Sequence, residues 1–537
     1  MSSTFSGFYV AKSGIQAARA NLQVTGQNMT NVNTKGYTRQ RVDSYAIASS
    51  GNNMRYASGE IGIGEGVYCS GVSQIRDPYL DIRYRAEHAK TGKTETQLDT
   101  LQDIDSIFDE TTKDGISAQF ADLLKQLKTL GATPSDYNLE VIVKSSAQLL
   151  TKAFNTASNK LAEIRKQQTK SLEKDEISNV NSLLKNIAHL NEEIKSSEIS
   201  GTPALELIDQ RNTKIDELSK YANIEVSSKQ VDVGSGRSVS ELHIDLVSGD
   251  KSFNLVTDNK FSSFGMTTDA DTGYVTMSLK DTDGNAVQAK DADGNVMNDG
   301  GGSPYTMTNA DLTEGTFSGY LTMLNEKGEF DAADGTERGI GYYENVLNKL
   351  AVSFADTMNT ANSTNPPAND NKPLFSTTDG KAMAAGNICL SNEWNTSTSA
   401  YITNTKQTAS AGVDPKTLGD NILYMVNQLG KDTTYKTSSD NTSGKTLFTT
   451  SIEAYISDVS VSVLGLQEKD ITQNDTSYNS TLDEINTQRA AVSSVDVNEE
   501  GINLIMYNQS LTASSRFMTT LDEAMDTIIN KMGIVGN

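Results

Sequence analysis

The sequence predicts an elongated α+β protein of several domains, with paired N- and C-terminal coiled-coil helices, a long α-helical rod and an inserted β-rich domain. Three observations support this prediction. Apolar residues recur every seven positions at both ends, and long helical patterns flank a β-rich stretch in the middle. The 537 residues are only 36 % apolar and 7 % aromatic, which suits a molecule with much surface and little core.

The first expected element is an N-terminal helix with a narrow apolar stripe. Its heptad positions are Phe8, Ile15, Leu22 and Met29, and a second row lies three residues later at Ala11, Ala18, Thr25 and Val32. Such a stripe is buried best against another helix. The following segment, NVNTKGY at 31–37, should form a turn that ends the helix, because Asn and Gly tolerate left-handed backbone.

The C-terminus carries a matching repeat. The heptad row is Leu504, Leu511, Met518, Met525 and Met532, with an offset row of Tyr507, Ser514, Leu521 and Ile528. Residues 1–42 contain five basic and no acidic residues, whereas residues 496–537 contain six acidic and two basic ones. Opposite charge would help the two ends to pair and set their register. We expect an antiparallel or staggered helical pair; the simpler alternative is two terminal helices that pack on separate cores.

Between the ends the pattern is first helical, then β-rich, then helical again. We expect a small hairpin within 43–80 and helices at 78–108, 116–130, about 135–197 and 204–221. An unbroken helix of about sixty residues would span roughly 90 Å. Alternation at Leu242, Ile244 and Leu246, and again at Val275, Met277 and Leu279, predicts half-buried strands.

Helix returns at 343–359, and residues 362–450 read as mostly irregular, with a helix near 418–429. The last helical stretch runs from residue 452 and joins the terminal heptads. The chain therefore runs out and back. We predict three domains: 1–60 with 496–537 as the terminal helical domain, 61–222 with 315–495 as the rod, and 223–314 as the β-rich insert.

Charge and composition exclude several classes of partner. The net charge is −23, which argues against nucleic acid, because phosphate contacts need clustered Lys and Arg. No run of eighteen apolar residues is present, so we expect no membrane partner. The N-terminus lacks the pattern of a cleaved signal peptide, and we expect either a cytoplasmic protein or export by a route without one.

No residue pattern indicates catalysis or a cofactor. His88, His189 and His243 are scattered, and we expect them on helix surfaces or strands. The repeated DTDGN and DADGN at 281–285 and 291–295 raise the alternative of calcium binding, but Gly stands at the fourth position rather than the sixth, which fits a tight turn better. Cys69 and Cys389 allow one disulfide at most. We predict a protein that is no enzyme, with no catalytic residues, metal or cofactor.

Both termini resemble bacterial flagellar axial proteins. Within QNMTNVNTKGYTRQRV at 27–42, the residues that match this family's loop motif are Asn28, Asn31, Thr34, Gly36, Tyr37 and Arg39. In the C-terminal signature, Glu499, Asn503, Leu504 and Tyr507 match, although Ser510 and Leu511 replace the usual small or aromatic pair. NEEIKSSEISGTPALELIDQRNTKIDELSKY at 191–221, GTFSGYLTMLNEKG at 315–328 and NDNKPLF at 369–375 resemble the hook-associated protein 1 family of hook–filament junction proteins.

The resemblance implies a structural role at the hook–filament junction. It implies a ring of copies on the hook tip, with terminal helices around the export channel and the rod and insert further out. Expected partners are the chain itself, hook protein, hook-associated protein 3 and an export chaperone; the expected location is extracellular, after flagellar type III export. The implied assembly interface comprises Phe8, Ile15, Leu22, Met29, Asn503, Leu504, Tyr507, Leu511, Met518, Leu521, Met525 and Ile528.

Three alternatives stay open at this point. The first is another axial protein, such as hook protein or flagellin, although the long helix at 135–197 and the terminal motifs together argue against both. A surface adhesin built on residues 223–314 is a second alternative, and an enzymatic insert is a third. The sequence gives no subunit number for the ring and no ligand for the insert.

Overall fold

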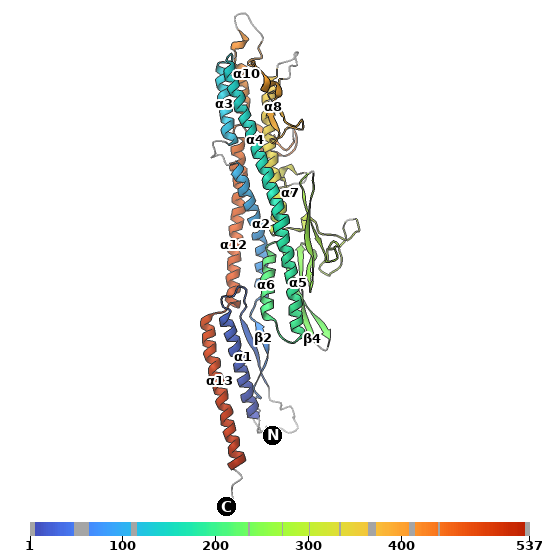
Figure 1. The fold of residues 1–537 in the computed structure, drawn as a ribbon, viewed down its shortest axis with the longest axis vertical. Helices are drawn as coiled ribbons and strands as arrows, with labels where there is room; N and C mark the ends of the chain where they lie inside the picture. The colour runs from blue at the N-terminus through green and yellow to red at the C-terminus, as the bar shows by residue number, and fades with distance from the viewer. Residues whose placement is uncertain are drawn as a thin grey trace, which may run out of the picture.

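The computed structural model is a long rod with both chain ends at one extremity (Figure 1). It describes residues 6–47, 64–108, 115–234, 237–270, 272–299, 301–331, 335–363, 372–407, 414–438 and 441–531. The protein is mainly helical, with small antiparallel sheets. Met532 of the C-terminal heptad row and residues 369–371 of the NDNKPLF segment lie outside the described residues.

The rod is built on one very long helix. α4 (Tyr137–Ser171) continues through a π-helical turn (Leu172–Glu176) into α5 (Ile177–Ile199), as the apolar spacing predicted. Asp136 starts it by accepting a hydrogen bond from the Asn138 backbone N–H, which is the usual role of Asp at an N-cap. α2 (Pro78–Phe108) and α3 (Ile116–Ala132) pack beside α4.

Four more helices complete the rod. They are α6 (Leu205–Ser219), α7 (Thr316–Asn325), α8 (Ile340–Asn362) and α12 (Gly465–Ser493), the last preceded by α11 (Tyr455–Asp458) and a π-helical turn (Val459–Leu464). α12 runs antiparallel to α2, since the Thr94 hydroxyl donates to Asp475 at 2.7 Å and the Arg489 guanidinium lies over the Tyr84 ring. Phe354 of α8 packs against Phe120 and Phe154, so α3, α4 and α8 share one core.

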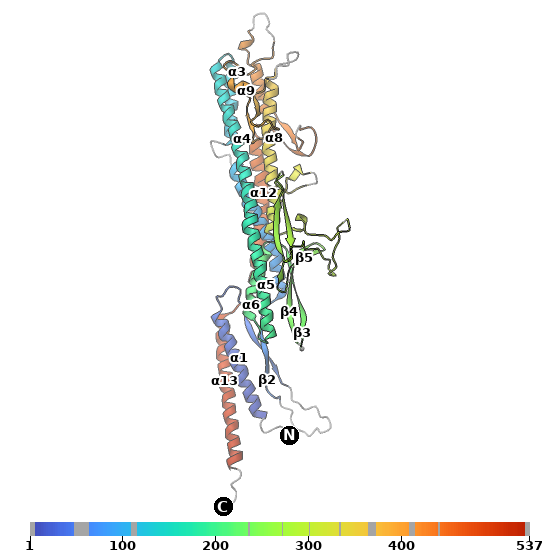
Figure 2. The ribbon, with the colours of Figure 1, turned by 45° about the vertical axis from the view of Figure 1, so that its right-hand side comes forward.

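The β-rich segment lies along α5 (Figure 2). One antiparallel sheet has the order β3 (Ile224–Gly234), β4 (Arg237–Ser248), β5 (Lys251–Thr257), β6 (Lys260–Phe261), and a second pairs β7 (Ser263–Thr268) with β8 (Val275–Lys280). The predicted alternating residues of β4 and β8 are buried. Asn181 of α5 exchanges two hydrogen bonds with the Phe264 backbone, which fixes the second sheet to the rod.

Three similar turns project from this segment. At 281–285, 291–295 and 299–303 the first Asp accepts two backbone N–H bonds from its own turn. The glycines at the fourth position, Gly284, Gly294 and Gly302, have φ of 84–85°, a backbone region that glycine enters without strain. The DxDGN repeats are thus tight turns, and the third copy, DGGGS, was not recognised in the sequence. No three potential ligand side chains gather around a metal position anywhere in the described residues.

The end of the rod far from the termini is more ordered than predicted. Residues 362–450 hold two hairpins, β9 (Phe375–Thr377) with β10 (Ile388–Leu390) and β11 (Thr433–Lys436) with β12 (Thr446–Thr450), besides α9 (Asn392–Thr396) and α10 (Asp420–Leu429). Strands of three to five residues are too short to show a period. Short 3-10 turns lie at Asn309–Asp311, Gly328–Phe330 and Pro415–Thr417. Cys69 of β2 and Cys389 of β10 are free thiols.

Beyond the other end of the rod lie the terminal helices. α1 (Ser6–Thr30) packs antiparallel along α13 (Val497–Asp526), which ends in a π-helical turn (Thr527–Lys531). β1 (Gln40–Ala46) and β2 (Val67–Gln74) form a hairpin beside α1, so strand pairing spans the boundary placed after residue 60. The last helical stretch reaches the terminal heptads through a break in the helix: α12 ends at Ser493, and Asp496 caps α13.

Candidate functional site: the joint between rod and terminal helices

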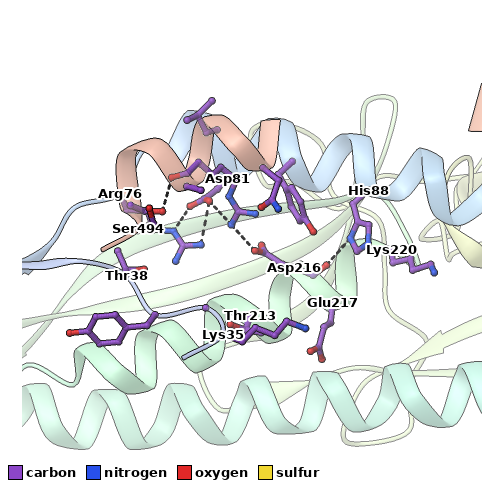
Figure 3. Close-up of a pocket in the computed structure, with 18 of the residues that line it drawn as sticks. Lys35, Thr38, Arg76, Asp81, His88, Thr213, Asp216, Glu217, Lys220 and Ser494 are labelled. Atoms are coloured by element: carbon purple, nitrogen blue, oxygen red, sulfur yellow. Dashed lines mark hydrogen bonds and ion pairs between the residues drawn. The ribbon is translucent and has the colours of Figure 1, made fainter. Parts of the chain in front are cut away.

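The predicted loop motif lies where the terminal helices meet the rod. A cavity of about 880 Å³ opens there between the loop and helices α2, α5, α6 and α12. Figure 3 shows Arg76 and Asp81 on one side of it, His88 and Lys220 farther along, and Asp216 between them. The joint is therefore formed by segments from the beginning, middle and end of the chain.

Asn28 holds the two ends of the loop together. Its Oδ1 accepts hydrogen bonds from the Tyr37 hydroxyl and the Gln40 N–H, both at 3.0 Å, and its Nδ2 donates to the Gln40 carbonyl at 2.9 Å. Burial, followed by the nearby acids Glu206, Asp209 and Glu500, raises the pKa of Tyr37 to about 12. The Tyr37 hydroxyl thus stays a hydrogen-bond donor throughout the physiological range.

Two further motif residues end α1. The Asn31 amide donates to the Gln27 carbonyl at 3.0 Å, and the Thr34 hydroxyl donates to Asn31 Oδ1 at 3.2 Å. The first bond adds a side-chain donor to a carbonyl in the last turn of α1, and the second holds the Asn31 side chain to the turn that follows. The predicted turn at 31–37 therefore has a direct cause in the side chains of the motif.

Gly36 allows the loop to touch the rod. Its φ is 80°, and a Cβ built on it would lie 2.2 Å from the Thr213 hydroxyl of α6. Any other residue at this position would meet both a strained backbone and a collision. The motif requires glycine here for contact with α6 as well as for the turn.

The first half of α6 is the surface that receives the loop. Buried Asp209 accepts hydrogen bonds from the Thr38 N–H at 2.9 Å and the Thr38 hydroxyl at 2.7 Å. Glu206 accepts from the amides of Gln27 at 3.1 Å and Gln40 at 3.3 Å. Sequence reasoning missed both acids. The available signal was their spacing, since Glu206, Asp209 and Thr213 share one helical face.

Arg39 connects the loop to the C-terminal helix. Its guanidinium donates to Glu500 at 2.7 Å and to Glu499 at 3.0 Å, and its backbone N–H donates to the Ser493 carbonyl at 2.8 Å. Glu500 is the one side chain of α13 that is fully buried among those described. The opposite charges of the two termini thus form ion pairs at the start of α13, and not along the contact between α1 and α13.

Four of the ion pairs at the cavity form one connected network. Asp81 binds Arg76 at 2.5 Å and Arg489 at 2.8 Å, while Asp216 binds Arg489 at 2.7 Å and Arg85 at 2.8 Å. The network ties α2, α6 and α12 together. A shared, partly buried set of this kind fixes geometry more than it adds stability.

His88 is half-buried at this cavity and is not the surface residue that we expected. Its Nδ1 lies 3.0 Å from the Asp216 carbonyl oxygen and 3.1 Å from the Ser219 hydroxyl. Burial lowers the pKa of His88, so the ring is neutral at neutral pH. His189 is an exposed helix residue and His243 a strand residue.

The predicted heptad residues lie along the contact between α1 and α13. Gly7 approaches Leu521, and Gly14 approaches Ser514, so small residues let the two helices come close. Half-buried positions of α1 include Phe8, Ile15, Leu22 and Met29; those of α13 include Asn503, Tyr507, Leu511, Met518, Leu521 and Met525. Leu504 and Ile528 are exposed. The structure therefore brings most of the set together but leaves these two open.

Comparison with known proteins gives the family. The sequence matches the flagellar hook-associated protein FlgK helical domain over residues 101–375, about half of the chain. The chain belongs to the FlgK family. Similar proteins include flagellar hook-associated protein 1 of Bacillus subtilis, which is 27 % identical over the whole of both chains. The protein of the same name from Escherichia coli is 25 % identical over 82 % of this chain and 71 % of its own.

A solved structure is also similar. It is the flagellar hook junction protein FlgK from Burkholderia pseudomallei, with a TM-score of 0.41, 21 % identity, and coverage of 55 % of this chain and 46 % of that one. The FlgK match, 101–375, covers most of the rod and the β-rich segment, whereas the joint lies mainly outside it. None of the described helices has the length and apolar character needed to cross a membrane.

Proposed function

We propose that this protein is a structural component of the bacterial flagellum that assembles on the hook tip and connects the hook to the filament. The observation that carries the proposal is the FlgK helical domain at 101–375 in a chain whose two ends form a helix pair outside the rod. Relatives are named as hook-associated proteins, so the proposed role is structural rather than enzymatic.

The terminal helices are the part that assembles. α13 has thirty residues, and Glu500 is its one buried side chain among those described. A long helix with so little buried surface is marginally stable alone. Packing α1 and α13 of many copies into a tube around the export channel would bury the remaining apolar side chains, and the heptad residues would contribute to this contact.

The proposed partners follow from a position at the junction. A ring of copies would contact hook protein on one side and hook-associated protein 3 on the other. Before export through the flagellar type III pathway, a cytoplasmic chaperone would hold the C-terminal region. The net charge of −23 keeps unassembled copies apart in solution, and the assembled protein would be extracellular.

Deletion of the gene tests the proposal. We expect hooks without filaments in electron micrographs and flagellin in the culture medium. Wild-type protein supplied in trans should restore filaments, whereas protein without residues 497–531 should not. Filaments of normal length and number on the deletion strain would refute the proposed function.

A further inference from the structure

The solvent side of the rod helix α4 is basic. α4 carries six basic and two acidic residues, in a chain whose net charge is −23. Arg165 is the only basic residue of α4 that forms an ion pair among the described residues, with Glu344 at 2.9 Å. Four of the others are exposed and lie away from the buried side of the helix; we call them the lysine face, and they are Lys152, Lys160, Lys166 and Lys170.

The lysine face is not balanced by acids of its own helix. Glu163 is the one exposed acid of α4, and it forms no ion pair with Lys160 or Lys166 among the described contacts. Lys166 and Lys170 lie four residues apart, so like charges meet on successive turns, which weakens a helix slightly. An acidic partner against the lysine face would remove this repulsion.

The three turns that project from the β-rich segment carry the opposite charge. Residues 281–303 contain five aspartates and one lysine, and this segment extends away from the rod, as Figure 1 and Figure 2 both show. The first Asp of each turn accepts backbone N–H bonds. Asp283 and Asp293, at the third position, are exposed, and their carboxylates form no hydrogen bond or ion pair within the described part of the chain.

The turns themselves do not require these two aspartates. In the third turn Gly301 takes the same position, and its N–H donates to the first Asp at 2.9 Å, just as the N–H of Asp283 does. The next residue also has the same backbone, with φ of 85° at Gly284 and 84° at Gly302. The carboxylates of Asp283 and Asp293 therefore serve neither the turn nor a contact within the described chain, which points to a partner outside it.

We infer that Asp283 and Asp293 of one copy bind the lysine face of α4 in a second copy of this chain. The two surfaces have opposite charge, which selects the partner and its orientation, and neither surface is paired within its own chain. Contact between two different surfaces is a head-to-tail arrangement, which closes into a ring when the rotation allows. The inference rests on the proposed function, because copies must first assemble side by side.

A disulfide between copies tests the contact directly. In a background of Cys69→Ser with Cys389→Ser, which removes both free thiols, the deletion strain produces one chain with Asp293→Cys and a second chain with Lys160→Cys. Because each chain carries a single cysteine, a disulfide between residues 293 and 160 can form only between copies. Mild oxidation of isolated hooks with attached filaments should give a dimer of these two chains.

The matched control replaces Lys160→Cys by Lys128→Cys. Lys128 is an exposed lysine of α3 outside the lysine face, and it should give no dimer with Asp293→Cys above background. Since a disulfide needs Cα atoms within about 7 Å, Lys152→Cys and Lys166→Cys are tested in the same way. Filaments without dimer from any of the three lysine-face positions would overturn the inference.

Charge reversal tests the energetic role of the contact. Lys160→Glu with Lys166→Glu places acids opposite the turns of the next copy. Both lysines are exposed, so the melting temperature should match that of the wild type. The fraction of cells that keep filaments after a fixed shear should fall about fivefold, the effect of about 1 kcal/mol. Lys125→Glu with Lys128→Glu, on α3, makes the same charge change elsewhere and should stay near wild type.

Reversing the turns in the same chain identifies the partner. Adding Asp283→Lys with Asp293→Lys to the Lys160→Glu, Lys166→Glu chain should restore the retained fraction. If the first reversal has no effect, the inference fails; if its effect is not restored, the lysine face binds a different acidic partner, and the inference fails as well. Both results leave the proposed function standing, because only normal filaments on the deletion strain refute that.

Discussion

The long rod helix (α4 and α5) and the C-terminal helix α13 both carry apolar residues at helical spacing, but their side chains are buried to very different extents. From α4 through α5, side chains such as Val143, Leu150, Phe154 and Leu184 are fully buried at intervals of three, four or seven residues and belong to the main core. Along α13 only Glu500 is buried among the described side chains, and the α1-facing row is half exposed. The difference is in partners within the chain and not in helix length.

This difference in burial separates a part of the protein that is stable by itself from a part that needs neighbouring molecules. The rod helix has α2, α3, α7, α8 and the β-rich segment around it, so its stability is complete within one copy. α13 has α1 on one side and open surface elsewhere. Since most helical stability in proteins comes from tertiary packing, we expect the rod to be rigid alone and the terminal pair to depend on neighbours.

Amide hydrogen exchange on the free protein should show the largest contrast. Residues 6–40 and 500–531 should exchange about 1,000-fold or more faster than α4 and α5, because opening the terminal pair exposes few buried contacts. On assembled material the same residues should become protected. Equal protection of α13 and α4 in the free protein would contradict the comparison.

Truncating one aromatic residue in each region is expected to give a smaller but still clear difference. Phe154→Ala removes a fully buried ring that packs on Phe354 and should lower the free energy of unfolding by about 3–5 kcal/mol. Phe517→Ala removes a half-exposed ring and should cost less than about 1 kcal/mol. Urea denaturation of both full-length variants measures this, and similar costs would show that α13 is packed more tightly than described.

The same contrast explains what could be predicted from sequence. Local features of the sequence set two helices, Pro78–Phe108 and the one that begins at Tyr137. Their apolar residues recur with helical spacing, and a proline marks the start of each pattern, so the structure has both as predicted. The turn motif was found through its own residues. The surface of α6 that receives the loop was missed. Its acids Glu206 and Asp209 bind partners more than 160 residues away in sequence, and no local sequence pattern predicts such a contact.

The hairpins at 375–450 were missed for a different reason. Their strands are short, and their order depends on contacts with α4 and α8. Buried Glu140 of α4, for example, accepts bonds from the Trp394 ring N–H and from the backbone of Tyr401 and Ile402. A carboxylate in α4 thus organises an otherwise irregular segment, which composition alone does not reveal.

At the joint, Gly36→Ala should separate the two regions. The new Cβ would meet the Thr213 hydroxyl in a left-handed backbone, at a cost of about 1–3 kcal/mol. We expect faster exchange in 6–47, fewer filaments and unchanged protection of α4. The control is Gly26→Ala, which meets nothing within 4 Å near the C-terminal end of α1 and should stabilise that helix by about 0.5–1 kcal/mol. Equal behaviour of the two variants would refute the role assigned to Gly36.

The smallest effect should come from protonation of Asp209. Burial, opposed by the bonds from Thr38 and the charge of Arg76, raises the pKa of Asp209. Because the folded pKa lies above the unfolded one, the stabilising contribution from protonation is fully present below the unfolded pKa, about 3.9, and is lost as pH rises through the folded pKa. Asp209→Asn keeps an acceptor for Thr38 without the charge, so it should remove this part of the pH dependence.

Exchange of the Thr38 amide, followed from pH 4 to pH 7 in both proteins, measures the difference after correction for intrinsic rates. Wild-type protection should decline relative to Asp209→Asn over this range, while α4 and α5 should show no difference between the two proteins. If the rod changed as well, Asp209 would be acting on the whole fold, and the joint would not be a separate unit from the rod. If protection of Thr38 instead rose with pH relative to the variant, the Thr38 bonds would favour the charged carboxylate more than burial disfavours it.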